Sequence, residues 1–153
     1  MLWKPRVTVA AVVEQRGRYL MVEETIAGQN VYNQPAGHLE DGESLVEAAV
    51  RECREETAWQ FQPEAIVGIY RWRRSRERDT YLRVTFTGHC TGHLPDEPLD
   101  TDIVAAHWLT LDEIHERRSR LRGPLVMRSL NDYLQGKRYP LELLVDLHGD
   151  KLP

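Results

Sequence analysis

The chain has 153 residues, of which 41% are apolar and 29% charged, proportions typical of a soluble globular protein. This length is enough to bury a core, so we predict one domain over residues 1–153. A formal net charge of −4 disfavours nucleic-acid binding, and the lack of a long apolar run disfavours a signal peptide or membrane span. The two cysteines, Cys53 and Cys90, form no Cys-x-x-Cys pair, which favours a reducing, cytoplasmic location.

Apolar runs separated by turn residues predict strands and helices in an irregular order. The first two strands should form a hairpin across Gln15-Arg16-Gly17. The last helix should begin at Pro124 and end before Gly136. Strands are predicted over residues 7–13, 19–22, 31–35, 65–72, 80–87 and 103–109, and helices over 44–57, 111–117 and 124–134. This order predicts an α/β fold with a mixed β-sheet sandwiched between α-helices.

The central predicted helix carries three glutamates close together. Ser44 and Glu47 form a capping box, which places the first helical residue at Leu45. At about 100° per residue, Glu52 and Glu56 lie beside the core-facing stripe, and Glu55 lies one step further round. The stripe itself consists of Leu45, Val46, Ala49, Val50 and Cys53.

The position of these acids suggests metal binding. Carboxylates three and four residues apart repel one another on a helix, and a bound cation would compensate. An all-oxygen ligand set favours Mg²⁺, with Mn²⁺ as the other hard ion, over zinc. Arg51 and Arg54 lie further round, where Glu47 could pair with Arg51. The alternative is a partly exposed acidic helix face with no ligand.

The residues before and within this helix follow a recognisable spacing. Gly37 is followed after five residues by Glu43, and after seven more by Arg51-Glu52-Cys53-Arg54-Glu55-Glu56. This resembles the Nudix box of the Nudix hydrolases, Gly-x5-Glu-x7-Arg-Glu-U-x-Glu-Glu-x-Gly-U, where U is a bulky apolar residue. The flanking segments 33–40 and 138–142 look most like the NudJ phosphatase subgroup. The resemblance implies a Nudix fold over essentially the whole chain.

Two positions depart from the family pattern. Ala58 stands where the family has glycine, and Cys53 is small for its apolar slot. If the backbone at Ala58 is left-handed, alanine costs roughly 1 kcal/mol there; otherwise the helix ends differently. Neither change removes a candidate metal ligand, so they bear on stability or on the aim of the following loop.

The resemblance also implies a chemistry and assigns roles to residues. A Nudix hydrolase cleaves a diphosphate linked to another moiety, with divalent metal supporting attack by water on phosphorus. Carried over by position, Glu52, Glu55 and Glu56 would bind metal, and one of them would also act as general base. The Gly37 carbonyl is a further candidate ligand. Arg51 would orient the glutamates, and Glu43 would support Arg51 or bind metal through water.

In many Nudix enzymes an acidic residue outside the box joins the metal cluster. Asp100 and Asp102, just before the strand predicted at 103–109, are the candidates here. The two alternatives stay open at this point.

Candidate substrate contacts lie outside the box. Arg83 faces away from its apolar neighbours in a strand and could bind phosphate if that face lines a cleft. Trp72 and Tyr32 could stack on a substrate ring, or pack in the core or at its rim. His38 could face the cleft or be a satisfied loop histidine. The basic run 70–78 could clamp phosphates or form a solvated hairpin loop.

We therefore expect a Mg²⁺-dependent Nudix hydrolase acting on a small-molecule phosphoanhydride. Nucleoside di- and triphosphates and small organic pyrophosphates, such as those of thiamine metabolism, are the expected substrates. The rival interpretation is a non-catalytic Nudix sensor of a nucleotide metabolite. Nucleic-acid binding through the arginine-rich run is disfavoured by the negative net charge. A monomer and a homodimer are both compatible with the sequence.

Overall fold

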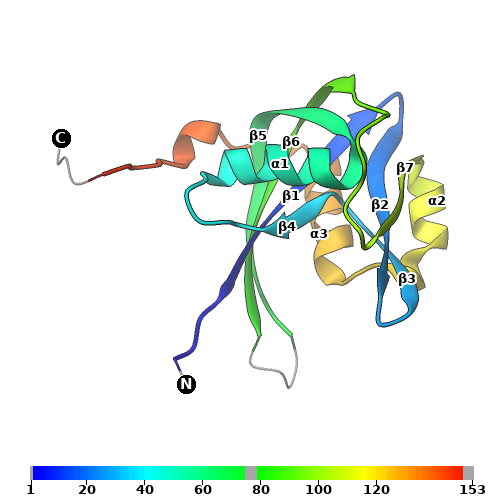
Figure 1. Cartoon of the computed structure of the whole chain (residues 1–153), viewed down its shortest axis with the longest axis horizontal. Coiled ribbons are helices and arrows are strands. Elements are labelled where there is room, and N and C mark those ends of the chain that lie inside the picture. The colour runs from blue at the N-terminus through cyan, green and yellow to red at the C-terminus, as the bar shows by residue number, and fades with distance from the viewer. Residues whose placement is uncertain (1, 75–78, 150–153) are drawn as a thin grey trace.

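The computed structural model describes residues 2–74 and 79–149 and is built on seven strands (Figure 1). The strands are β1 (Arg6–Gln15), β2 (Arg18–Ile26), β3 (Gln29–Asn33), β4 (Ala36–His38), β5 (Trp59–Arg73), β6 (Thr80–His93) and β7 (Ile103–Leu109). The helices are α1 (Leu45–Thr57), α2 (Leu111–Glu116) and α3 (Pro124–Leu134), with the short 3-10 turns η1 (Arg118–Arg120) and η2 (Leu141–Leu143). No helix in the described ranges is long and apolar enough to cross a membrane.

The sheet is mixed, as the sequence predicts. The main strand order is β3-β2-β1-β6-β5, with β4 paired to β1 and β7 paired to β2. β1 and β6 run parallel, with Val9 opposite Val84, and the other pairs are antiparallel. β1 therefore holds both β6 and β4, and its pairing with β4 places Gly37 opposite Val9.

Helices cover both faces of the sheet because the strand side chains alternate in direction. On one face, Val9, Ala11 and Val13 of β1 pack in a buried cluster with Ala48, Ala49 and Cys53 of α1. On the other face, Val12 packs in a second cluster with Ile114 of α2 and with Val126 and Leu130 of α3. The predicted α/β sandwich is confirmed.

The predicted elements are present with some different boundaries. β2, β5 and β6 are longer than predicted, and in β5 the pairing with β6 continues past Pro63 through a register shift. β4 was not predicted; it is a three-residue strand inside the expected glycine loop. Residues 75–78 of the basic run lie outside the described residues.

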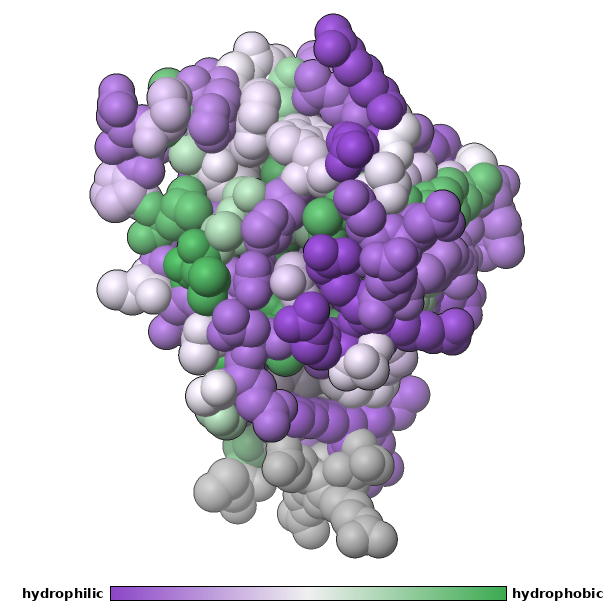
Figure 2. All heavy atoms as spheres, turned by 90° about the vertical axis from the view of Figure 1, so that its right-hand side faces the viewer, coloured by the Kyte–Doolittle hydropathy of each residue, from purple (hydrophilic) through white to green (hydrophobic). Residues whose placement is uncertain are grey.

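The side of the molecule that carries α2 and β7 presents mainly hydrophilic residues (Figure 2). Leu109 of β7 and Ile114 of α2 are buried beneath this surface, whereas Val104 of β7 is exposed. Both buried residues belong to the cluster beneath α2 and α3, so α2 contributes to the core through one face.

Helix α1 ends in a left-handed residue even though the family's glycine is absent. Ala58 has φ 59° and ψ 13°, a left-handed conformation, and its N–H donates to the Arg54 carbonyl at 2.8 Å. Its own carbonyl accepts from the Leu94 N–H at 2.9 Å, and its methyl group is buried. The helix thus ends as it would with glycine, and alanine occupies the strained position.

Substitution of Ala58 should separate backbone strain from packing. Ala58→Gly should raise the free energy of unfolding by ~0.5–1 kcal/mol, since relief of left-handed strain exceeds the lost methyl and the added chain freedom. Ala58→Val should lower it by more than ~2 kcal/mol, because β-branched residues resist this conformation. Urea unfolding measures both. A glycine variant less stable than the parent would show that the buried methyl outweighs the strain.

Candidate active site

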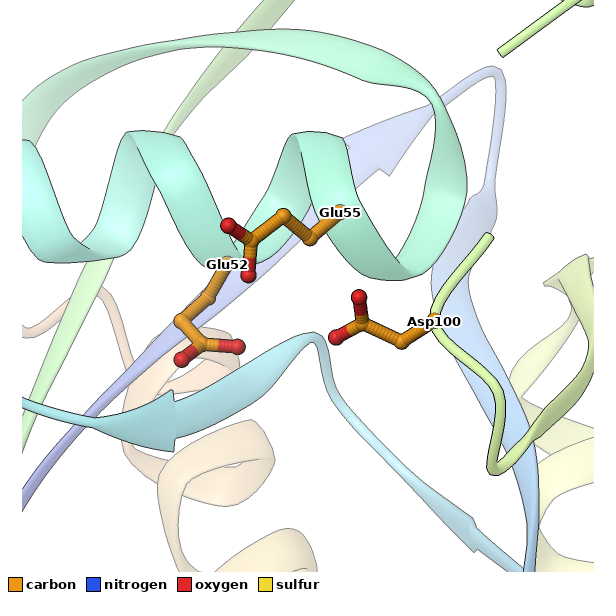
Figure 3. Close-up of side chains that lie close together, drawn as sticks. All are labelled: Glu52, Glu55 and Asp100. Carbon is orange, nitrogen blue, oxygen red and sulfur yellow. The ribbon is translucent and has the colours of Figure 1, made fainter. Parts of the chain in front are cut away.

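Three carboxylates converge beside the C-terminal half of α1. Glu52 and Glu55 project from the helix, and Asp100 comes from the loop between β6 and β7 (Figure 3). One oxygen from each of the three lies within 4.8 Å of the others. Oxygen donors at this spacing can share one hard cation.

Gly37 makes room for the most enclosed of these carboxylates. A Cβ atom at this position would lie 2.1 Å from the Glu52 carboxyl carbon. Any side chain at residue 37 would therefore displace Glu52. The need for glycine comes from this close approach and not from an unusual backbone angle.

Glu56 points to a different part of the site. Its side chain is buried, and its Oε1 accepts a hydrogen bond from the Ala36 N–H at 2.7 Å. Burial raises the pKa of Glu56 to about 9, and the Ala36 hydrogen bond only partly opposes this. The negative charges of Glu52, Glu24 and Asp100 raise this pKa further. Burial also raises the pKa of Glu52, against the opposing hydrogen bond from Arg51.

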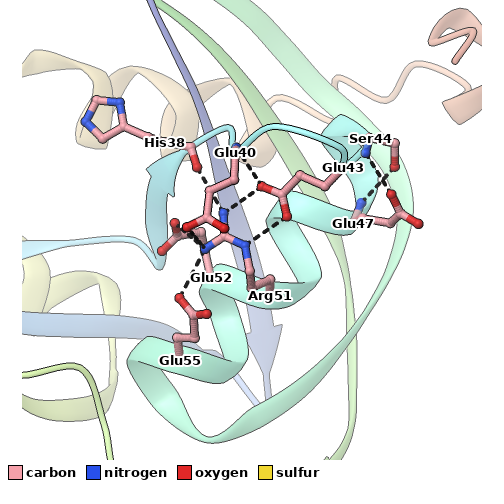
Figure 4. Close-up of polar contacts among 8 residues, drawn as sticks. All are labelled: His38, Glu40, Glu43, Ser44, Glu47, Arg51, Glu52 and Glu55. Atoms are coloured by element: carbon pink, nitrogen blue, oxygen red, sulfur yellow. Dashed lines mark hydrogen bonds and ion pairs between the residues drawn. The ribbon is translucent and has the colours of Figure 1, made fainter. Parts of the chain in front are cut away.

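Arg51 connects the acids to the loop before the helix (Figure 4). Its Nε and Nη2 donate to the two oxygens of Glu43 at 2.8 and 2.7 Å. Its Nη1 donates to Glu52 at 2.8 Å and to Glu55 at 3.1 Å. The Arg51 hydrogen bonds lower the pKa of the Glu43 carboxyl and keep it ionised. Arg51 thus contacts both Glu43 and two of the clustered acids, while an orienting role for Arg51 and a supporting role for Glu43 stay predictions.

One expected ion pair of α1 is not formed. The Glu47 carboxylate accepts from the Ser44 N–H at 2.7 Å, completing the capping box, and does not pair with Arg51. Glu43 takes its place, because it lies in the loop that folds back over the helix and offers both oxygens to the guanidinium. This bidentate geometry is the stronger arrangement.

The structure separates the two acidic candidates outside the box. The Asp100 N–H donates to the Glu55 carbonyl at 3.0 Å, which fixes its carboxylate next to the cluster. The Asp102 carbonyl instead accepts from Thr25 of β2 at 3.0 Å. Asp100 is therefore the residue outside the box that the fold brings to the acids.

A cleft of about 240 Å³ is lined by Gly37, the residue against which Glu52 packs. Ala36 and Gly37 line it together with the charged, polar and aromatic side chains of Glu24, Asn33, His38, Trp72, Arg74, Tyr81, Arg83 and Arg122. Burial lowers the pKa of His38, which favours its neutral form. The cleft thus combines cationic and aromatic groups, as a phosphorylated ring compound would require.

Two of the three expected substrate contacts line this cleft. Arg83 is buried, its Nη2 donates to Gln34 Oε1 at 3.0 Å, and its buried Nε has no hydrogen-bond partner among the described residues. Trp72 lines the cleft while stacking on Tyr81, with ring centroids 5.6 Å apart.

Tyr32 lies away from the cleft. It is buried in the cluster beneath α2 and α3, and the guanidinium groups of Arg117 and Arg120 lie 5.4 and 5.1 Å from its ring centroid. The structure therefore places Tyr32 in the core, the alternative left open by the sequence.

The sequence did not single out Arg122 and Glu24. Arg122 Nη1 donates to Glu24 Oε1 at 3.0 Å, and the Arg122 N–H donates to the Tyr32 carbonyl at 2.8 Å. These contacts bring Arg122, which lies just before α3, next to Glu24 of β2 and Tyr32 of β3, about ninety positions earlier in the chain. Local patterns in the sequence contain no signal of such a long-range contact.

The raised pKa of Glu56 predicts a pH dependence of stability in the absence of divalent cations. Between its reference pKa of 4.5 and its folded-state pKa of about 9, the folded protein retains a proton that the unfolded chain has lost. Stability in EDTA should therefore fall as pH rises across this window, by up to ~1.4 kcal/mol per pH unit. Glu56→Gln should give a shallower slope in urea unfolding between pH 5 and 9. Identical slopes would contradict the burial of an ionisable group here.

Comparison with known proteins agrees with this geometry. The model of the NUDIX domain matches residues 3–129. Phosphatase NudJ from Escherichia coli (strain K12) is 44% identical over 147 residues, covering 96% of this chain and 95% of that protein. A NUDIX hydrolase from Nitrosomonas europaea superposes with a TM-score of 0.93 at 50% identity, covering 96% of this chain and 100% of the other.

More distant structures share the fold. A UDP-X diphosphatase superposes with a TM-score of 0.72 at 18% identity, covering 92% of this chain and 68% of that one. The family pattern spans most of the chain, and Glu52 and Glu55 of the box meet Asp100 at one site. The chain therefore belongs to the Nudix hydrolase family.

Proposed function

We propose that the protein is a Mg²⁺-dependent hydrolase that cleaves a phosphoanhydride bond in a small organic phosphate, with Mn²⁺ as a possible substitute. One observation carries the proposal: the oxygen cluster of Glu52, Glu55 and Asp100 adjoins a cleft that holds cationic and aromatic side chains, with Gly37 between them. Such a site can place a metal next to the phosphates of a bound substrate.

The donor set fits a hard cation. Glu52, Glu55 and Asp100 would hold the ion, with the Gly37 carbonyl and Glu56 as further ligands at the cleft side. When bound, the metal would neutralise phosphate charge and lower the pKa of a nearby water. Arg51 orients the Glu52 and Glu55 carboxylates through its two hydrogen bonds. A glutamate of this group would accept the proton of the attacking water.

Glu56 is suited to a role in proton transfer. The Ala36 N–H fixes one of its oxygens, and burial keeps its proton affinity high. A nearby cation would lower that affinity and release the carboxylate as a ligand or base. The base function would therefore depend on occupancy of the metal site.

The cleft suggests how the substrate would bind. Arg83, whose Nε has no hydrogen-bond partner among the described residues, would contact a phosphate oxygen. One face of Trp72 stacks on Tyr81, and Trp72 would contact the organic group of the substrate. Tyr32 lies outside this cleft and has no place in this part of the proposal.

The choice of substrate follows the relatives. Similarity to a protein named Phosphatase NudJ supports release of orthophosphate. Nucleoside di- and triphosphates and thiamine-pathway pyrophosphates are the compounds we propose to test. We propose that the protein acts in the cytoplasm, where the free thiols of Cys53 and Cys90 would remain reduced.

A substrate panel tests the proposed activity. The protein should be incubated with Mg²⁺ and nucleotides, sugar nucleotides or thiamine-pathway pyrophosphates, and the products identified by phosphorus NMR. We expect turnover with orthophosphate as the released product. Pyrophosphate as the product would correct the bond that is cleaved. Tight binding of one compound without turnover of any would favour the non-catalytic sensor.

Glu56→Gln should lower kcat by at least ~10²-fold, as expected when a ligand or general base is lost. The fold should persist, since glutamine can still accept the Ala36 hydrogen bond. Glu47→Gln is the matched control, because Glu47 lies on the same helix but outside the acid cluster, and glutamine preserves a capping box. Near-full Mg²⁺-dependent turnover by the Glu56 variant would overturn its assignment.

A further inference from the structure

The loop between β6 and β7, residues 94–102, crosses the C-terminal end of α1 (Figure 1). Two backbone hydrogen bonds attach it there. The Leu94 N–H donates to the Ala58 carbonyl at 2.9 Å, and the Asp100 N–H donates to the Glu55 carbonyl at 3.0 Å. The last carbonyls of a helix lack partners within the helix, so the loop satisfies groups that would otherwise need water.

A third attachment lies between these two. Arg54 of α1 faces Glu97 of the loop with both ends of its guanidinium: Nε donates to Oε2 at 2.9 Å, and Nη2 donates to Oε1. The Glu97 N–H donates to the Leu94 carbonyl at 3.0 Å, so Glu97 belongs to a closed turn. The pair therefore connects α1 to a fixed part of the loop.

Electrostatics makes this third attachment important. The loop carries four acids and no basic residue, Asp96, Glu97, Asp100 and Asp102, and it docks beside the glutamates at the C-terminal end of α1. Arg51 and Arg54 are the two basic residues of that helix. Arg51 is already bonded to Glu43, Glu52 and Glu55. Arg54 is thus the cation of α1 that is available to hold the acidic loop against acidic neighbours.

We propose that Arg54 is a positioning residue for the metal site. Its ion pair with Glu97 holds the loop on α1 and thereby keeps the Asp100 carboxylate beside Glu52 and Glu55. The proposal rests on the proposed metal-binding function of that cluster. Arg54 is not among the three cluster carboxylates and does not line the cleft described above, but it lines a separate hollow with Glu55, Glu97 and Asp100.

Measurements of folding stability and of cation affinity distinguish a purely structural role of this pair from a positioning role. The Arg54 and Glu97 side chains are 52% and 36% exposed, and an ion pair this exposed contributes little to folding stability. Its loss should leave the unfolding midpoint nearly unchanged. In the positioning role, the same loss weakens cation binding, because the Asp100 carboxylate is less often in place.

Mn²⁺ binding measured by electron paramagnetic resonance, without substrate, tests the proposal. Arg54→Ala and Glu97→Ala should each weaken Mn²⁺ binding about 3- to 5-fold, within the range of a partly exposed ion pair. The charge-swapped double variant R54E/E97R should restore the affinity to within about twofold. Arg18→Ala is the matched control, since Arg18 forms an ion pair of similar exposure with Glu113 on α2, away from the acids.

A double-mutant cycle shows whether Arg54 acts through Asp100. Asp100→Asn should weaken Mn²⁺ binding, and adding Arg54→Ala should then have little further effect. Unchanged Mn²⁺ affinity in Arg54→Ala, or effects that add fully to those of Asp100→Asn, would overturn the positioning role and leave the metal site intact. Absence of Mn²⁺ binding by the unmodified protein would overturn both.

Discussion

The repulsion among carboxylates at the end of α1 is the constraint on which the site depends. Glu52, Glu55 and Asp100 bring oxygens within 4.8 Å of one another, and Glu56 is buried close by. Like charges this close destabilise a fold unless something compensates. The protein compensates with a guanidinium shared among the acids and a raised proton affinity for the buried carboxyls, and the Arg54–Glu97 ion pair holds the acidic loop in place.

The same constraint explains why the glycine loop and the helix are coupled. Glu52 can approach β4 only because Gly37 has no side chain, and the Glu56 carboxyl is held by the neighbouring Ala36 N–H. Pairing of β4 with β1 fixes both residues against the centre of the sheet. The number of residues between Gly37 and the glutamates is therefore the length of chain needed to bring β4 and α1 into contact.

Much of this arrangement could be predicted from sequence because it is local. The capping box at Ser44 fixes where α1 begins, and the 3.6-residue period then determines which faces hold Leu45, Glu52 and Glu56. The choice between Asp100 and Asp102 was not predictable, because it depends on which amide reaches the Glu55 carbonyl. Arg122 and the core position of Tyr32 were likewise invisible, since both depend on contacts between distant segments.

The left-handed Ala58 connects the helix end to the metal site. The Ala58 carbonyl accepts from the Leu94 N–H, and this bond lies at the start of the loop that carries Asp100 six residues later. Glycine would adopt the same angles with less strain, but it would restrict the chain less where α1 passes into β5. Alanine in this position costs stability and restricts the backbone between the helix and the strand. The departure from the family pattern therefore lies where backbone geometry sets the position of a candidate ligand, and the glutamates themselves are unchanged.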